Sequence, residues 1–277
     1  IEELDPTLGA WQEVYAEEAR AAARIADAEV SSNRRKGPFH GVPFALKDIV
    51  EVEGKRTAAG CFEWKDRQST MTAEVAQRLI DAGGILLGKT KTVEFAMGGW
   101  GTNQRMGTPH NPWDKNVART PGGSSSGSGV SVASGMVPCA IGTHTGGSVR
   151  LPAAFCGIAG LKTTEGLLPT SGIVPLSHTL DTPGPMARSV ADVAVMFDAL
   201  VGGPTGVDLN GGVHGIRVGC LPDDERRGIE QTQLAAYDRS LELLAELGAE
   251  IMQFKPPKPF EETKASTFVI VTAEGYF

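Results

Sequence analysis

The stretch from Arg119 to Lys162, RTPGGSSSGSGVSVASGMVPCAIGTHTGGSVRLPAAFCGIAGLK, decides how the rest of the chain is interpreted. It is rich in glycine and serine, as flexible linkers are. It also contains apolar runs such as VSVASG and FCGIAG, which a linker would not carry. Small residues interleaved with apolar ones are typical of a packed segment in which the backbone approaches something closely. Two glycine–serine clusters, 122–124 and 146–148, are therefore the candidates for chemistry.

Composition limits the partners that we expect. The chain has 277 residues, 41% of them hydrophobic, and a formal net charge of −7. This is enough to bury a sizeable core, in one large domain or two small ones. Lysine and arginine are scattered, so nucleic acid is not an expected partner. No signal peptide and no apolar run of bilayer length is evident, so we expect no membrane partner and a cytoplasmic location.

The metal-ligating residue types form no recognised pattern. Four cysteines lie far apart, and the five histidines form no HxxxH motif. We therefore expect no metal and no cofactor. Cys139 and Cys156 stand in apolar segments and are predicted to be small core residues.

The periodicity of apolar residues predicts an α/β architecture. A strand, a helix and a second strand follow one another near the C-terminal end, which implies a parallel pair in a layered sheet. The capping box Ser189–Asp192 is expected to open another helix. The predicted helices span 8–32, 72–82 and 229–247, the predicted strands 41–50, 85–88, 216–220 and 251–254, and the predicted loop 92–116.

Residues Gly83 to Thr90 match GxxxxGK[ST], the pattern of a phosphate-binding loop. Such a loop needs a strand before its first glycine and a helix after its lysine. Here the helix comes before, and Ile-Leu-Leu occupies the place of the loop. The order of the elements therefore argues against nucleotide binding.

Three interpretations of the serines compete on the residues alone. Gly123–Gly127 matches GxSxG, which would make Ser125 a nucleophile at a strand-to-helix turn. Pro121 disfavours the strand that this turn requires, and neither His178 nor His214 is marked as a base. In the second interpretation the serines only pack tightly and cap helices. The third rests on the spacing of several motifs along the chain.

These motifs together resemble the amidase signature family. The resemblance runs in order from about Gly37 to Leu200, far beyond any single motif. The segments that carry it are 41–48 (GVPFALKD), 94–98 (EFAMG), 111–114 (NPWD), 121–127 (PGGSSSG), 146–153 (GGSVRLPA), 156–162 (CGIAGLK) and 180–185 (LDTPGP).

The resemblance implies an α/β layered fold with a central mixed β-sheet flanked by helices. It implies one amidase signature domain over residues 1–277. Members are generally longer at both ends, so we expect this domain to be truncated, most evidently at its C-terminus at Tyr276 and Phe277.

The resemblance also implies an activity and assigns roles. The activity is hydrolysis of the carbon–nitrogen bond of a small or medium linear, non-peptide amide. Ser148 is implied as the nucleophile that forms an acyl-enzyme, Ser124 as the cis-serine that relays a proton, and Lys47 as a base that acts when neutral. Lysine becomes neutral near pH 7 only if desolvation or a like charge lowers its pKa. From the residues alone, Lys47 either reaches the surface or is buried in its apolar run; burial would supply the desolvation.

The resemblance also implies backbone hydrogen-bond donors, a substrate pocket and a small-molecule substrate. The backbone N–H groups of Thr145, Gly146, Gly147 and Ser148 would face the developing oxyanion. A small-molecule amide is the implied partner, and a homodimer is a permitted assembly. Two alternatives are the glutamine-hydrolysing component of a tRNA-dependent amidotransferase and a catalytically silent binding homologue. The first usually has a Gly-Arg-Val-Ser-Arg-Tyr-Gly stretch that this chain lacks. The suggested pocket residues are Met97, Gly98, Gly99, Trp100, Gly122, Gly123 and Ile173.

His144 departs from the family pattern, which usually has aspartate there. An aspartate could pair with Arg150, whereas a protonated histidine would repel it. Two interpretations stay open: a neutral core histidine, or one that titrates in the working pH range. The second predicts an acid-side loss of activity near the usual histidine pKa of about 6.5, or below it if burial and Arg150 oppose the charge.

Overall fold

The computed structural model describes residues 1–114 and 116–275. The C-terminal end at Tyr276 and Phe277, where the sequence predicts truncation, lies outside the described residues, as does Lys115 of the predicted loop. The chain divides into two compact units, Gly206–Ala273 and the remainder. The prediction of a single domain stays a prediction.

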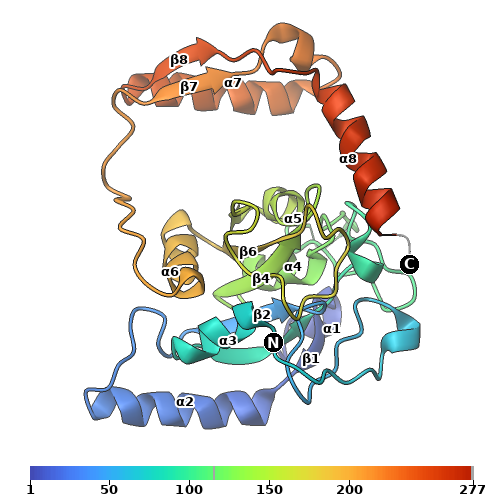
Figure 1. Ribbon diagram of the computed structural model, residues 1–277, viewed down its shortest axis with the longest axis vertical. Helices are drawn as coiled ribbons and strands as arrows, with labels where there is room; N and C mark the ends of the chain where they lie inside the picture. Colours follow the sequence, from blue (N-terminus) through green and yellow to red (C-terminus); the bar gives the residue numbers. More distant parts are fainter. Residues whose placement is uncertain (115, 276–277) are drawn as a thin grey trace. The chain divides into compact units, whose positions relative to one another are not determined.

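The larger unit contains a six-stranded mixed sheet (Figure 1). The strands are β1 (Trp11–Val14), β2 (Pro43–Lys47), β3 (Ile85–Thr90), β4 (Cys139–His144), β5 (Ala159–Gly160) and β6 (Thr182–Ala187). Their order is β1-β3-β2-β4-β6-β5. The strand β2 pairs in parallel with β3 and β4, and the other pairs are antiparallel. This confirms the expected mixed sheet.

Helices cover both faces of the sheet, as the sequence predicts. They are α1 (Asp5–Leu8), α2 (Ala16–Ser31), α3 (Glu74–Asp81), α4 (Ser126–Ala133), α5 (Arg150–Cys156) and α6 (Val190–Val201). Two 3₁₀ turns, η1 (Phe62–Trp64) and η2 (Glu94–Ala96), lie in the loops. The helix α6 begins at the predicted cap, where Ser189 Oγ accepts a hydrogen bond from the Asp192 N–H.

Alternation along β2 separates two cores. Phe44 and Leu46 pack with α3 and α6, whereas Ala45 packs with α4 and Cys156. Successive side chains of a strand point to opposite faces. Lys47 therefore follows Ala45 onto the face covered by α4. Cys139 and Cys156 are buried, as predicted.

The smaller unit contains β7 (Arg217–Cys220), η3 (Asp223–Arg226), α7 (Gln231–Glu246), β8 (Glu250–Gln253) and most of α8 (Phe260–Glu274). The strands β7 and β8 are parallel and are joined by α7, which confirms the predicted strand–helix–strand unit. Tyr237 of α7 accepts a hydrogen bond from the Leu221 N–H at 2.8 Å. In the described part of the chain, no helix is long and apolar enough to cross a membrane.

One predicted element is wrong at its start. The sequence predicts a single helix over 8–32, but Trp11–Val14 is a strand and the helix α2 begins at Ala16. Gly9 adopts a left-handed conformation (φ 60°) and ends the short helix α1. The strand then pairs with β3, a partner more than 70 residues away that local periodicity cannot reveal.

Candidate active site

Lys47 ends β2 in the protein interior. Its side chain is fully buried, and Nζ donates hydrogen bonds of 2.7 Å to Ser124 Oγ and to Thr143 Oγ1. Burial lowers the lysine pKa to about 7, against an opposing effect of the Asp181 charge. Of the two positions that the sequence left open for Lys47, the buried one is therefore correct. A substantial fraction of this lysine is neutral near pH 7.

Ser124 lies in the loop that leads into α4. The peptide bond between Gly123 and Ser124 is cis, and Ser124 is fully buried. Its carbonyl accepts hydrogen bonds from the Val93 N–H (3.2 Å) and from Thr92 Oγ1 (3.0 Å). A Cβ at Gly123 would lie 2.7 Å or less from the Gly98 carbonyl oxygen and from the Gly101 nitrogen, so only glycine fits before this serine.

Ser125 ties the two glycine–serine loops together. Its Oγ donates to the Thr143 carbonyl (3.3 Å) and accepts from the Thr143 N–H (3.2 Å). Its N–H donates to the Ser148 carbonyl at 3.3 Å. Its side chain is fully buried, so it lacks the exposed hydroxyl that a nucleophile elbow requires.

Ser148 lies in the turn between β4 and α5 and is 7% exposed. Among the described residues, no hydrogen bond joins its Oγ to Ser124 Oγ; the two loops are joined by the backbone contact of Ser125. Catalytic hydrogen bonds are often long before substrate binds. The structure thus brings Lys47 and Ser124 into direct contact and places Ser148 in the adjoining loop.

The loop before Ser148 presents free backbone donors. Within the described chain, the N–H groups of Gly146, Gly147 and Ser148 have no acceptor. Gly146 is exposed, and a Cβ there would meet nothing within 4 Å. Thr145 Oγ1 donates to the Asp181 carboxylate, which fixes the start of the loop. Such a loop can donate hydrogen bonds to a bound oxyanion.

The suggested pocket residues fall into two places. Gly98, Gly99, Trp100, Gly122 and Gly123 gather beside these loops: the Gly123 N–H donates to the Gly99 carbonyl at 2.7 Å, and Trp100 is 69% exposed. Ile173 pairs with Val50 beyond the end of β2 and precedes Val174, which lines a cavity together with Met97. Met97 is 48% exposed and leads from η2 towards the first group.

His144 is a buried histidine between two donors. The Val149 N–H donates to Nδ1 at 3.3 Å, and an Arg150 nitrogen lies 3.2 Å from Nε2. A neutral imidazole has one nitrogen that accepts and one that carries a hydrogen. Only one of the two donors, Val149 N–H or Arg150, can therefore form a hydrogen bond to the ring. Burial lowers the histidine pKa to about 4, and the positive charges of Arg150, Lys162 and Lys47 add to this. His144 is therefore neutral at pH 7.

Three residues to which the family resemblance assigns no role support the site. Thr143 accepts from Lys47, and Ser125 holds the loops together. Asp181 accepts from Thr145, and its second oxygen accepts from the N–H groups of Leu176 (2.8 Å) and Ser177 (3.1 Å). The signal for Asp181 is its place in the motif LDTPGP; for the other two, no sequence pattern indicates the contact.

A second buried lysine lies in the neighbouring strand β3. Lys89, part of the segment that matches a phosphate loop, is in the strand β3, and its Nζ donates to Asp48 Oδ1 at 3.0 Å. Both side chains are almost fully buried. The segment therefore forms a strand and a structural ion pair.

Among the described residues, Cys61, Glu63 and Glu94 place potential metal-ligating atoms within 4.8 Å of one another. Glu63 is also ion-paired with Arg105 at 2.5 Å.

Comparisons with known proteins identify the family of the chain. The family model described as Amidase matches residues 1–276. The chain is 38% identical to a component of the glutamyl-tRNA(Gln) amidotransferase from Acidothermus cellulolyticus, over 99% of this chain and 56% of the relative. It is 40% identical to 2-amino-5-chloromuconic acid deaminase from Comamonas testosteroni, over 92% of this chain and 55% of the relative.

The fold is also found among solved structures. The peptide amidase of Stenotrophomonas maltophilia superimposes with a TM-score of 0.85 at 32% identity, over 98% of this chain and 60% of that one. The chain thus spans little more than half the length of the curated relatives that it matches.

Proposed function

This chain belongs to the amidase family, and on that premise we propose that it hydrolyses the carbon–nitrogen bond of an amide through an acyl-enzyme on Ser148. The observation that carries the proposal is the contact of 2.7 Å between Lys47 and Ser124, because it joins a lysine with a pKa of about 7 to a buried hydroxyl beside Ser148.

In the first half of the reaction, Ser148 Oγ attacks the amide carbon. Its proton passes to Ser124, and the proton of Ser124 passes to neutral Lys47. The tetrahedral oxyanion accepts hydrogen bonds from the N–H groups of the loop 145–148, and those of 146–148 have no other acceptor in the described chain. The carbon–nitrogen bond then breaks, and a proton returns through Ser124 to the leaving nitrogen.

In the second half, water attacks the ester carbon of the acyl-enzyme. The same relay takes a proton from the water and gives one to Ser148 Oγ as the ester bond breaks. The products are an acid and ammonia or an amine. The relay uses three side chains, and the proposal includes no cofactor.

The substrate that we propose is a small or medium linear amide that is not part of a peptide chain. This small molecule is the expected partner of the protein. One solved structure of similar fold is a peptide amidase, so amides at the end of a peptide are the natural comparison in a substrate screen.

A second candidate function is hydrolysis of the glutamine side-chain amide within an amidotransferase. It is favoured by the 38% identity to a component of such a complex. It is disfavoured by the stretch GLLPTSG at 166–172, which stands where that component usually has Gly-Arg-Val-Ser-Arg-Tyr-Gly.

The test is release of ammonia from acetamide, propionamide, a peptide C-terminal amide and glutamine. We expect turnover of the simple amides by the wild-type protein and none by Ser148→Ala. Selective turnover of glutamine would favour the second candidate. No turnover of any amide, with no acyl-enzyme detected by intact mass, would leave a silent binding homologue as the better account.

A further inference from the structure

A cavity of about 740 Å³ is lined by segments whose backbone is hydrogen-bonded to parts of the proposed site. Cavities of this size with mainly apolar walls are typical of small-molecule sites. Glu94 adds a carboxylate to the lining. The apolar lining residues are Trp64, Phe95, Met97, Val174, Pro175 and Leu176.

One wall of the cavity is attached to the backbone of Ser124. The Val93 N–H donates to the Ser124 carbonyl at 3.2 Å, and the chain then turns through 94–97 along the cavity. Phe95 and Met97 are therefore only a few residues from a direct contact with the proposed relay.

A second lining segment, 174–176, is attached to the other two parts of the site. The Val174 N–H donates to the carbonyl of Ile49, two residues after Lys47, at 2.8 Å. The Leu176 N–H donates to Asp181, whose other oxygen accepts from Thr145 of the oxyanion loop. The backbone segments that hold the proposed catalytic groups thus also hold the walls of this cavity.

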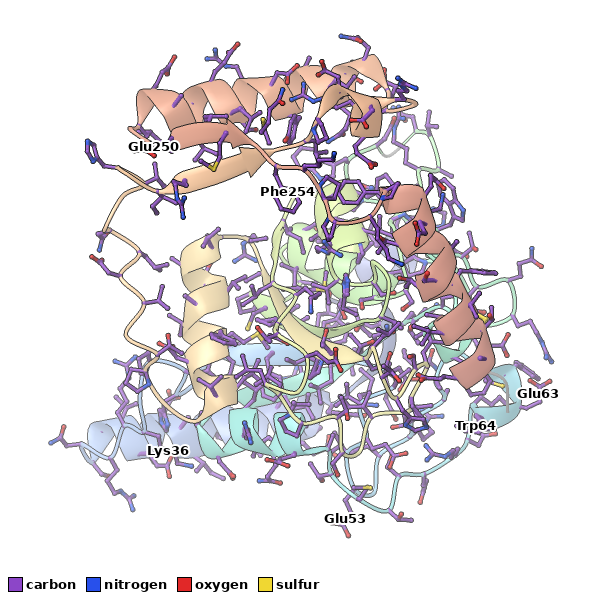
Figure 2. All side chains as sticks on the ribbon, turned by 45° about the horizontal axis from the view of Figure 1, so that its top comes forward. Lys36, Glu53, Glu63, Trp64, Glu250 and Phe254 are labelled. Carbon is purple, nitrogen blue, oxygen red and sulfur yellow. The ribbon has the colours of Figure 1, made fainter. Side chains whose placement is uncertain are left out.

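The aromatic wall is held in an unusual conformation. Phe95 (φ 45°) and Ala96 (φ 61°) both have left-handed backbone, which is unfavourable for bulky residues. Such conformations persist where the surroundings determine them, often at functional sites. The Phe95 N–H donates to the Ala59 carbonyl at 2.8 Å, and the Phe95 ring meets Trp64 edge to face at 5.0 Å. Figure 2 labels Trp64 on the turn η1.

We propose that this cavity receives an uncharged apolar group of the amide substrate, preferably an aromatic ring, packed against Trp64 and Phe95. The proposal rests on the proposed function and names its substrate class. Aromatic rings pack favourably edge to face or offset, which the pair of Trp64 and Phe95 allows. The Glu94 carboxylate disfavours a carboxylate on the same group.

The first experiment measures kcat/KM for acetamide, 3-phenylpropanamide and N-benzylacetamide. Trp64→Ala is expected to lower kcat/KM for an aryl amide about tenfold more than for acetamide, because an apolar contact is lost. Trp64→Phe should retain most of the selectivity. Met97→Glu, at an exposed position of the same lining, should reproduce the selective loss by placing a charge in the cavity.

The matched control is Phe62→Ala. Phe62 is an exposed aromatic residue of the same turn η1 and lies outside the cavity lining, so its removal should leave the selectivity unchanged. Selective loss in either aryl series supports the proposal and tells whether the ring is on the acyl or the amine side. Equal effects of Trp64→Ala on all three amides would overturn it.

A second experiment separates this proposal from the proposed function. Calorimetry measures binding of the two aryl amides to Ser148→Ala, with and without Trp64→Ala. Weaker binding when Trp64 is removed supports the cavity even if the wild-type protein hydrolyses no amide. Unchanged binding in a protein whose wild-type form hydrolyses acetamide would reject the cavity and leave the proposed function standing.

Discussion

At the scale of single residues, Lys47 determines how the proposed relay responds to pH. Its Nζ contacts two hydroxyl groups, of Ser124 and Thr143, and burial lowers its pKa to about 7. A base acts when unprotonated, so kcat/KM should rise as the pH increases through about 7 and level off above it.

Replacement of this lysine tests its role. We expect Lys47→Ala to lose about 10²- to 10⁴-fold in kcat/KM at pH 7, the usual contribution of acid–base catalysis. The remaining rate should increase with hydroxide concentration. Lys65→Ala, at an exposed position, is the control. Near-normal turnover of Lys47→Ala at neutral pH would remove the lysine from the mechanism.

His144 should influence the base through its lack of charge. An aspartate there could accept from both Val149 and Arg150, and its negative charge would favour protonated Lys47. His144→Asp should therefore move the rise of kcat/KM, which follows the deprotonation of Lys47 near pH 7, to higher pH. The uncharged His144→Asn should not move it. Profiles of kcat/KM against pH for the three proteins provide the measurement. Identical limbs in the Asp and Asn variants would contradict this electrostatic effect.

His144 should also make the stability of the protein depend on pH. Its folded-state pKa of about 4 lies below the ordinary 6.5, so the folded protein resists protonation. The unfolded chain binds the proton first, so stability from this residue is present above 6.5 and is lost as the pH falls towards 4. Urea midpoints at several pH values should decline over this window in the wild type and less in His144→Asn. Parallel declines in the two proteins would argue against this linkage.

At the scale of secondary-structure elements, the buried pair of Asp48 and Lys89 joins the ends of β2 and β3 beside Lys47. Removal of one member leaves an uncompensated buried charge, so Asp48→Ala should cost about 3–5 kcal/mol of unfolding free energy. Asp48→Asn with Lys89→Met should cost less, because no charge remains and Asn still accepts from the Ala58 N–H.

Urea unfolding measures these costs. The control is the exposed pair of Arg20 and Glu17, whose removal should change stability by about 1 kcal/mol or less. If Asp48→Asn with Lys89→Met loses as much unfolding free energy as Asp48→Ala, the cost does not come from an uncompensated charge, and the expectation is wrong.

The elements that could be predicted from the sequence are those whose signals are local. The helices α3, α6 and α7 and the strands β7 and β8 follow from periodicity and caps. The predicted start of the first helix is wrong because Trp11–Val14 is a strand only through its pairing with β3. Lys47 could not be placed from its neighbours alone, since a lysine in an apolar run fits both a buried and an exposed end.

At the scale of the whole molecule, the proposed site depends on contacts between distant segments. Lys47 lies 77 residues from Ser124 and 96 from Thr143 in the sequence, and the sheet brings them together. The ordered motifs predicted a set of site residues, and two of them, Lys47 and Ser124, are in direct contact. They could not predict the contacts that hold it, such as Ser125 with Thr143 or Asp181 with Thr145, because these depend on the packing of loops.

The central claim is that Ser148 is the covalent nucleophile, and labelling with a fluorophosphonate tests it most directly. The protein is treated with the reagent, digested, and the modified peptide is mapped by mass. We predict one adduct on Ser148, formed more slowly in Lys47→Ala and absent in Ser148→Ala. An adduct on Ser125, or equal labelling in the wild-type protein and Ser148→Ala, would contradict the account.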